Sequence, residues 1–230
     1  MKKIGFIGTG VMGSSMVKHL LNAGYPVTVY NRTKEKAQAV IDAGATWADT
    51  PKEVATKSDV VLTIVGYPTD VEEVYFGEEG IFQGLQEGMV LIDLTTSTPS
   101  LAKKIAEEAE KFSCEALDAP VSGGDLGAKN GTLSTMVGGK EFVLEEVRPI
   151  LETFSKTVTL QGTNGAGQHT KMANQIMIAG TMTGLVEMLV YAKAAELDLE
   201  KVLQTVGAGS AANWSLSNYG PRILKKDYSP

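Results

Sequence analysis

The sequence predicts an α/β fold, with a domain of alternating strands and helices over residues 1–162 followed by an all-α domain over residues 163–230. Three observations support this division. Apolar stretches alternate with helical patterns through the first domain, which is typical of a mostly parallel sheet with right-handed crossovers. A glycine-rich turn follows the first apolar stretch. From Gln168 to about Glu196 the chain has no proline, and apolar residues recur every three or four positions, as in a helix.

Within the first domain, seven apolar segments have the length and composition of buried strands. The helices between them carry start signals. Thr50 precedes Pro51 and Glu53 follows, which predicts a capped helix start. Thr98 and Pro99 begin another helix in the same way. The predicted strands are Ile4–Ile7, Val27–Tyr30, Val60–Val65, Val90–Leu94, Ala116–Ala119, Ser134–Val137 and Thr157–Leu160. The helical domain should contain a second helix that begins behind Asp198 and ends near Gly207.

The turn after the first strand has the spacing Gly-x-Gly-x-x-Gly and leads directly into a helix. Gly8 allows a tight turn, Gly10 lets the backbone approach a pyrophosphate, and Gly13 lets the helix pack closely on the strand. The N–H groups at the helix start then face the phosphate charge. A second strand follows at the correct distance, so the sequence predicts a Rossmann-like dinucleotide site. Its loop residues are Gly8, Thr9, Gly10, Val11, Met12 and Gly13.

The residues after the second strand bear on the choice of cofactor. A site for NAD usually has an acidic residue there, which accepts hydrogen bonds from the ribose 2′-hydroxyl. This chain has Asn31, Arg32 and Thr33 instead. A guanidinium binds a phosphate through forked, charge-assisted hydrogen bonds, so the sequence favours NADP over NAD. A second interpretation also stands, in which Arg32 is a solvated surface residue and Thr33 caps the helix beginning at Lys34.

Composition excludes several classes of protein. With 43% apolar and 21% charged residues the chain is an ordinary globular protein, and its net charge of −6 argues against nucleic acid or an anionic membrane as partner. No uninterrupted apolar stretch reaches the length of a transmembrane helix. The single cysteine, Cys114, allows no internal disulfide, and we expect a cytoplasmic protein. No cluster has metal-ligand spacing, so no metal is expected, and His19 should be exposed.

Two further segments could carry chemistry. Ser122, Gly123 and Gly124 follow a strand and offer a hydroxyl with backbone N–H groups, which suits a carboxylate, although a flexible glycine turn has the same pattern. Lys171 and the amides Asn174 and Gln175 share one helix face. A helical lysine is usually solvated, but this one lies one turn into a helix, directly after the glycine-rich hinge at residues 162–167.

The chain resembles the β-hydroxyacid dehydrogenase family, which includes 3-hydroxyisobutyrate dehydrogenase, tartronate semialdehyde reductase and the glyoxylate/succinic semialdehyde reductases. Four segments match in order and span nearly the whole chain: Gly8–Gly13, Asp93–Ser97, Asp118–Gly124 and Gly165–Gln175. The Asn174–Gln175 pair is more similar to the tartronate semialdehyde reductase branch than to the isobutyrate enzymes.

The resemblance implies an NADP-dependent oxidoreductase that interconverts a small β-hydroxyacid and its oxo acid or semialdehyde by hydride transfer. It places the catalytic lysine on Lys171 and a neighbouring amide on Asn174. The remaining positions that it implies are Ser122, Gly123, Gly124 and Gln175 for a small carboxylate substrate, and Val65, Gly66, Thr95 and Thr96 for the cofactor.

The resemblance also leaves alternatives. Family members continue beyond the position of Pro230, so we expect the helical domain to be incomplete, and an NADP-binding chain without turnover is one alternative. A 6-phosphogluconate-type decarboxylating dehydrogenase is another, but no basic residues cluster near Ser122 or Lys171 to hold a sugar phosphate. An imine reductase would usually differ at the position of Lys171. We further expect a homo-oligomer that associates through the helical domain.

Overall fold

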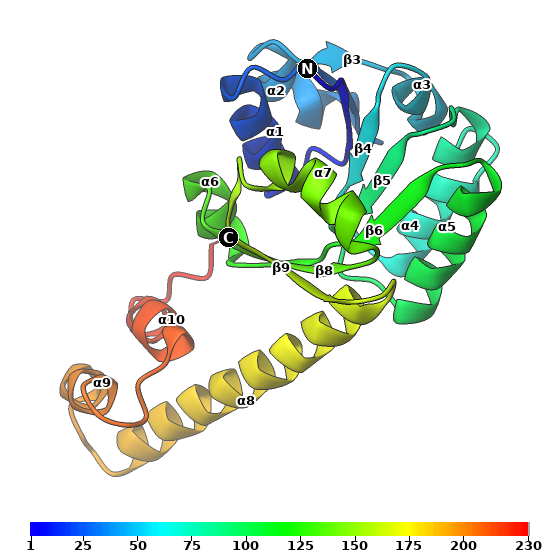
Figure 1. Cartoon of the computed structure of the whole chain (residues 1–230). Helices are drawn as coiled ribbons and strands as arrows, with labels where there is room; N and C mark the ends of the chain where they lie inside the picture. The colour runs from blue at the N-terminus through cyan, green and yellow to red at the C-terminus, as the bar shows by residue number, and fades with distance from the viewer. Residues whose placement is uncertain (230) are drawn as a thin grey trace. The chain divides into compact units, whose positions relative to one another are not determined.

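The computed structural model describes residues 1–229 (Figure 1). The chain divides into two compact units, one from Met1 to Lys171 and the other from Met172 onward. This division falls inside the long helix α8 (Ala166–Ala194), whereas the sequence places the domain boundary before that helix. The predicted architecture, a Rossmann-like sheet with helices followed by a helical region, is confirmed.

The first unit is built on one sheet with the order β3-β2-β1-β4-β5-β6-β8-β7, and β9 pairs with β8. The strands from β3 to β6 are parallel, while β8 runs antiparallel to β6 and β7. All seven predicted strands are present. The strands β3 and β7 were not predicted, because two residues are too few to show a period. The bounds are β1 Ile4–Ile7, β2 Val27–Tyr30, β3 Thr46–Trp47, β4 Val60–Thr63, β5 Val90–Asp93, β6 Glu115–Asp118, β7 Val121–Ser122, β8 Leu133–Gly138 and β9 Ser155–Gly162.

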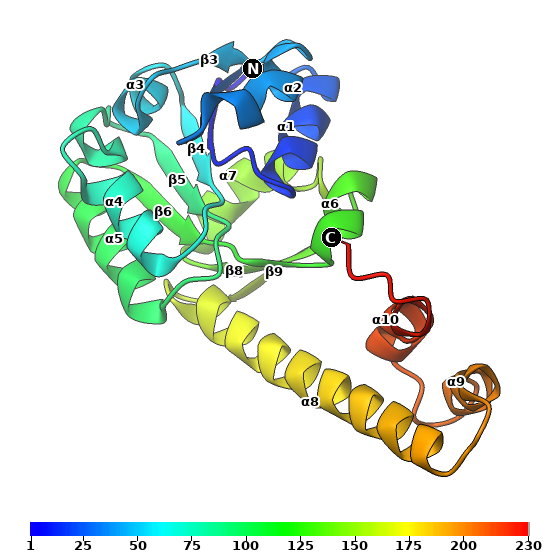
Figure 2. The same ribbon diagram turned by 180° about the vertical axis from the view of Figure 1, so that it is seen from behind.

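Helices cover both faces of this sheet. Figures 1 and 2 show α1, α2 and α7 on one face and α3, α4 and α5 on the other. Alternate strand residues point to opposite faces, so Phe6 packs in the core of the first face and Ile7 in the core of the second. The bounds are α1 Gly13–Asn22, α2 Gln38–Ile41, α3 Pro51–Thr56, α4 Pro68–Phe76, α5 Pro99–Lys111, α6 Gly124–Asn130 and α7 Glu141–Leu151, with 3₁₀ turns at Lys34–Ala37 and Ile81–Gln83.

Two of the predicted helix caps in this unit are confirmed and one is wrong. The Thr50 hydroxyl accepts a hydrogen bond from the N–H of Glu53, and Thr98 caps α5 in the same way. The Thr33 hydroxyl makes no capping bond. The segment after it begins as a 3₁₀ turn, and the Asn31 side chain donates to the Thr33 carbonyl and sets the chain direction instead.

The prediction that His19 is exposed is also wrong. Its ring is half-buried, and Nε2 donates to the carbonyl of Ala128 at 3.0 Å. This bond ties α1 to α6, a contact between segments far apart in the sequence. Cys114 is buried.

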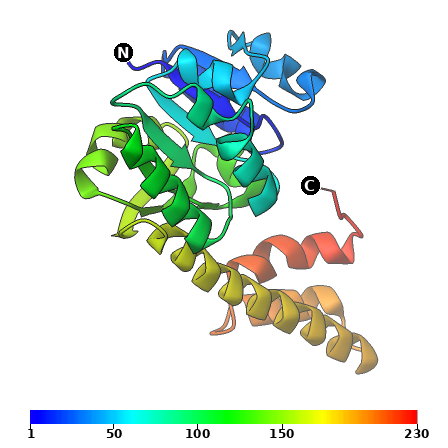
Figure 3. The same ribbon diagram turned by 90° about the vertical axis from the view of Figure 1, so that its right-hand side faces the viewer.

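The second unit contains the rest of α8 with α9 (Leu199–Gly207) and α10 (Trp214–Leu224) (Figure 3). Asp198 caps α9, as predicted, by accepting from the N–H groups of Glu200 and Lys201. The small hydrophobic core of this second unit joins the three helices through Leu185, Leu189, Leu203 and Leu216.

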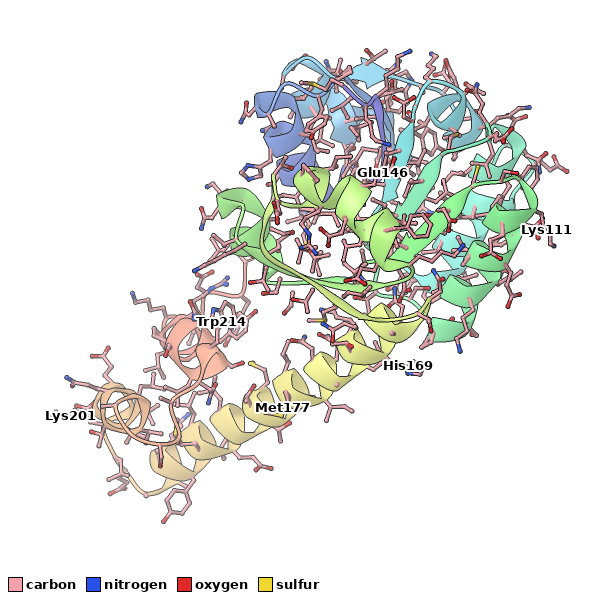
Figure 4. All side chains as sticks on the ribbon, viewed as in Figure 1. Lys111, Glu146, His169, Met177, Lys201 and Trp214 are labelled. Carbon is pink, nitrogen blue, oxygen red and sulfur yellow. The ribbon has the colours of Figure 1, made fainter. Side chains whose placement is uncertain are left out.

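Much of α8 in this unit carries apolar side chains that are exposed. Ile176 is 72% exposed and Met177 is 68% exposed. Figure 4 labels Met177 on α8. By length and composition alone, α8 is long and apolar enough to cross a membrane, with 17% of its most apolar window buried. The sequence prediction differs because it looked for an uninterrupted apolar run, whereas α8 mixes apolar residues with uncharged polar ones.

Candidate active site

A cleft of about 770 Å³ opens where β1, β2 and β4 end. Parallel strands present their carboxyl ends at one edge of the sheet, which is where ligands of such sheets bind. Thr9, Thr95 and Thr96 do not line it: the first two are buried, and Thr96 is exposed on the turn after β5. The predicted cofactor residues that line the cleft are Gly8, Gly10, Val11, Met12, Gly13, Asn31, Arg32, Thr33, Val65 and Gly66.

The three glycines of the first turn have different surroundings. Gly8 has a φ of +99°, and a Cβ there would lie 2.0 Å from the carbonyl oxygen of Ile64. A Cβ on Gly13 would lie 1.9 Å from the carbonyl oxygen of Gly8. No atom lies within 4 Å of the place where a Cβ on Gly10 would sit. Gly8 and Gly13 therefore make the turn and the close helix packing possible, and Gly10 leaves the backbone open to the cleft.

Asn31 braces this turn. Its Oδ1 accepts from the N–H of Thr9 at 3.0 Å, and its Nδ2 donates to the carbonyl of Thr33 at 2.8 Å. An aspartate could make only the first of these bonds, because an ionised carboxylate cannot donate. The choice of asparagine therefore has a structural reason as well as the one that the sequence suggested.

Arg32 lies beside this brace with its side chain 83% exposed. One guanidinium nitrogen lies 3.3 Å from Oδ1 of Asp70, on α4. Lys36 also lines the cleft. Sequence reasoning missed Lys36 and Asp70. The position of Asp70 three residues after Tyr67 does indicate a capping role, and its Oδ2 accepts from the Tyr67 N–H. Its pairing with Arg32 has no local signal.

The turn after β5 is held by a buried carboxyl. Oδ1 of Asp93 accepts from the hydroxyl of Thr63 at 2.8 Å and from the N–H of Thr95 at 3.0 Å. The Thr95 hydroxyl in turn accepts from the N–H of Val65. Burial raises the pKa of Asp93 to about 6, against the opposing effect of these hydrogen bonds. The network fixes Thr95 next to a residue that lines the cleft.

Lys171 is not a solvated surface lysine. Only 7% of the residue is exposed, and its Nζ donates to the carbonyl of Val121 at 2.8 Å. Burial lowers the pKa of the ammonium, because the charged form loses hydration. The ammonium therefore lies against β7, whose next residue is Ser122. The structure brings together the lysine and the Ser-Gly-Gly turn, two features that the sequence predicted separately.

The backbone of this turn has a shape that glycine favours. Ser122 ends β7 and is half-buried, while Gly123 and Gly124 are exposed. Their φ angles are +132° and +65°, a region that other residues rarely occupy. The two glycines are thus required by the conformation of the turn and leave its amides without side-chain cover.

Asn174 and Gln175 lie further along α8, in the second unit. The Asn174 amide donates to Oε1 of Gln175 at 3.0 Å, and Gln175 is exposed. Their roles toward a substrate remain predictions. His169 is exposed on α8 (Figure 4), two residues before the buried Lys171.

Sequence reasoning missed two buried residues that fix the start of α8. They are Asp118, whose carboxylate accepts from the N–H groups of Gly165 and Gln168, and Gln168 itself, which has no exposed surface. Asp118 begins one of the four segments that resemble the family, but no neighbouring residue in the sequence indicates that its carboxylate would bind the start of α8.

Comparison with known proteins gives matches along the whole chain. Residues 3–162 match the NAD binding domain of 6-phosphogluconate dehydrogenase, and residues 165–230 match the NAD-binding domain of NADP-dependent 3-hydroxyisobutyrate dehydrogenase. The chain is 55% identical over 229 residues to probable 3-hydroxyisobutyrate dehydrogenase-like 1 of Arabidopsis thaliana, covering 99% of this chain and 68% of the relative.

Two further similar proteins have ligands or reactions in their names. The 2-hydroxy-3-oxopropionate reductase of Escherichia coli is 38% identical over 228 residues, which cover 99% of this chain and 78% of that protein. The solved structure of Psf3 in complex with NADP⁺ and 2-OPP superimposes with a TM-score of 0.92 at 28% identity, covering 98% of this chain and 80% of Psf3.

Proposed function

The chain belongs to the family of 3-hydroxyisobutyrate dehydrogenase-like NAD(P)-dependent oxidoreductases, and from that premise we propose that it interconverts a small β-hydroxyacid and its oxo acid or semialdehyde with NADP. The observation that carries the proposal is Lys171, a buried lysine held against the Ser-Gly-Gly turn. When bound, the nicotinamide supplies or accepts the hydride.

The cleft fits a dinucleotide. Gly10 leaves open space at the turn, and α1 begins without a side-chain cap or an acidic residue in its first turn. Such a helix start attracts a pyrophosphate through its N–H groups and its dipole. The residues that would hold it are Gly8 to Gly13.

The proposed preference for NADP depends on Arg32. Its guanidinium is exposed beside the cleft and faces only one carboxylate, that of Asp70, in the hydrogen bonds of the described residues. A ribose 2′-phosphate would offer a stronger acceptor than this exposed pair, because charge-assisted forked bonds to phosphate are among the strongest hydrogen bonds. Asn31, engaged in the brace, carries no charge that would repel the phosphate.

Lys171 is the proposed proton donor and acceptor. In the reducing direction its ammonium gives a proton to the oxygen of the reacting carbonyl as the alkoxide charge develops. In the oxidising direction the neutral amine takes the hydroxyl proton. A free lysine rarely reaches the neutral form near pH 7, so the lowering of the Lys171 pKa by burial serves this second direction.

Ser122, with the amides of Gly123 and Gly124, is the proposed anchor for the substrate carboxylate. Gly123 and Gly124 are exposed and have no side chain that would cover their backbone N–H groups. The resemblance adds Asn174 and Gln175 as polar groups toward the substrate. The relative named 2-hydroxy-3-oxopropionate reductase makes a three-carbon semialdehyde acid the first substrate to test.

The test is NADPH oxidation with glyoxylate, tartronate semialdehyde, succinic semialdehyde or methylmalonate semialdehyde. A second assay follows NADP⁺ reduction with 6-phosphogluconate, which tests the decarboxylating alternative. We expect reduction of at least one of the oxo acids, its loss in Lys171→Met, and nearly unchanged NADPH binding in that variant. Lys193→Met is the matched control, since Lys193 is an exposed lysine on the same helix.

Two outcomes would contradict the proposal. Retained turnover in Lys171→Met would remove the lysine from the reaction. NADPH binding with no turnover of any substrate would favour a chain that binds the cofactor without catalysis.

A further inference from the structure

Gln168 makes a two-ended bridge inside the first unit. It lies in the first turn of α8 and has no exposed surface. Its Nε2 donates to the carbonyl of Thr95 at 2.7 Å, and its Oε1 accepts from the N–H of Ser97 at 2.8 Å. The two partners fix the orientation of the amide, because a carbonyl must be met by the nitrogen and an N–H by the oxygen. The side chain is therefore fastened to the turn that follows β5.

The main chain of Gln168 is fixed as firmly. Its N–H donates to Oδ2 of Asp118 at 2.8 Å, and the other oxygen of that carboxylate accepts from Gly165 at 2.7 Å. A Cβ on Gly167 would lie 2.4 Å from the carbonyl oxygen of Met136, so only glycine allows this approach. The start of α8 is thus joined to the end of β6 by its backbone and to the turn after β5 by one side chain.

The two elements joined by Gln168 are those that the proposed reaction uses. Lys171 lies three residues further along α8, on the same helix face, and donates to Val121. At the other end Thr95 accepts from Val65, which lines the cofactor cleft. Among the described residues, Gln168 is the side chain that hydrogen-bonds directly from the lysine-bearing helix to this turn.

We propose that Gln168 is a positioning residue, whose bridge sets the distance between the Lys171 ammonium and the cofactor-side turn at Thr95–Ser97. This proposal rests on the proposed function of Lys171 as proton donor and acceptor. Proton and hydride must reach neighbouring atoms of one carbonyl group, so an error of about 1 Å between their sources can reduce turnover by about 100-fold.

Asn164 provides a matched control. Its Nδ2 donates to the carbonyl of Ala116 at 2.7 Å, so it too is an amide side chain that ties the segment before α8 to β6. Among the residues that the structure describes, the Asn164 side chain makes no hydrogen bond to the turn at Thr95–Ser97. A loss that comes only from weaker anchoring of α8 should appear equally in Asn164→Leu and in Gln168→Met.

The experiment compares Gln168→Met, Gln168→Glu and Asn164→Leu with the wild type in steady-state reduction of the oxo acid that the substrate panel identifies. In Gln168→Met we expect kcat to fall by about 10- to 100-fold while the Kd for NADPH changes by less than about threefold. Asn164→Leu should keep kcat within about threefold of the wild type. Gln168→Glu should recover activity at low pH, where the protonated carboxyl can donate to Thr95, and lose it as the glutamate ionises.

Two measurements on the cofactor-free protein complete the test. Amide hydrogen exchange at Ser97 should accelerate in Gln168→Met and not in Asn164→Leu. The NMR titration of Lys171 should change in the same variant only, because its ammonium is no longer held at Val121. If Gln168→Met does not fold, the pH profile and the exchange rate of Gln168→Glu decide.

The outcomes separate this inference from the proposed function. An unchanged kcat in Gln168→Met, with faster exchange at Ser97, would overturn the positioning role of Gln168. The proposed role of Lys171 in proton transfer would not be affected. An equal fall of kcat in Asn164→Leu would also overturn it, in favour of general anchoring. If the wild type reduces none of the oxo acids, the proposed function fails. Exchange at Ser97 and the titration of Lys171 would then still show whether Gln168 couples the two elements, and an unaltered Lys171 titration would overturn the inference.

Discussion

Asp93→Asn is predicted to stabilise the protein at neutral pH and to remove part of its pH dependence. Asp93 is 4% exposed and accepts from Thr63 and Thr95, yet burial raises its pKa from 3.8 to about 6. Between these two values the folded protein holds a proton that the unfolded chain has released. Stability from this group is therefore fully present below about pH 3.8 and is lost as the pH rises through about 6.

The size of the effect follows from this difference in pKa. Each pH unit corresponds to about 1.4 kcal/mol, so ionised Asp93 costs the fold about 3 kcal/mol at pH 7.5. An amide oxygen can still accept from Thr63 and Thr95, while the side chain no longer ionises. At pH 4 we therefore expect Asp93→Asn to lie within about 1 kcal/mol of the wild type, the size of one altered hydrogen bond. At pH 7.5 it should be more stable by up to about 3 kcal/mol.

The assay is urea unfolding of both proteins from pH 4 to 7.5, without cofactor. Asp118, whose pKa burial also raises, is present in both proteins, and its charge is the smallest of the causes that act on the Asp93 pKa, so most of its titration cancels in the difference. Thr63→Val serves as a second variant. It removes a donor to the ionised carboxylate, and we expect stability to fall more steeply with pH, by about 1 kcal/mol more. A constant difference between wild type and Asp93→Asn at every pH would refute the reasoning.

Three further predictions concern the cleft and α8. Gly13→Ala places a Cβ 1.9 Å from the carbonyl oxygen of Gly8, so we expect a loss of about 3 kcal/mol in urea unfolding together with weaker NADPH binding. Unchanged stability of Gly13→Ala would contradict the close packing of the helix on this turn. Arg32→Ala should weaken NADPH binding by about 10- to 100-fold in fluorescence titration and leave NADH unaffected, whereas Asp70→Asn should strengthen NADPH binding by up to about fivefold. Equal losses for both cofactors would exclude recognition of the 2′-phosphate. We propose that the exposed apolar side of α8 associates with a second copy of the chain, so Ile176→Lys should shift sedimentation equilibrium toward monomer. A wild-type protein that stays monomeric at all concentrations would contradict this association.

Several features could be predicted because they depend on neighbouring residues. Gly13 meets a steric limit at the carbonyl oxygen of Gly8, in the same turn, and the caps at Thr50, Thr98 and Asp198 use the N–H groups of the turn that follows. The steric limit on Gly8 lies at Ile64, far along the chain, and the local part of its requirement is its positive φ. The length and apolar composition of the seven longer strands identified them in the same way. The two-residue strands β3 and β7 could not be identified, because their pairing depends on partners elsewhere in the sheet.

Two sequence predictions were wrong, the helix cap at Thr33 and the exposure of His19. Thr33 has the residue type of a helix cap, but the segment after it begins as a 3₁₀ turn and the Thr33 hydroxyl makes no capping bond. His19 stood beside a lysine on an amphipathic helix, yet α6 supplied a carbonyl for its ring. For His19 a hydrogen bond to a distant segment, rather than the local pattern, decided the outcome.

The sequence by itself determined the strand–turn–helix that forms the dinucleotide turn, the order of strands and helices, and the residue types available for chemistry. Only the tertiary structure decided the burial, the pKa and the hydrogen-bond partners of these residues. Lys171 became a buried ammonium because Val121 lies against it, Asp93 became a carboxyl with a raised pKa because the sheet covers it, and Gln168 became a bridge because the turn after β5 lies within its reach. The physical reason is that desolvation and hydrogen bonding act through space, so residues distant in the chain set the charge and position of each functional group.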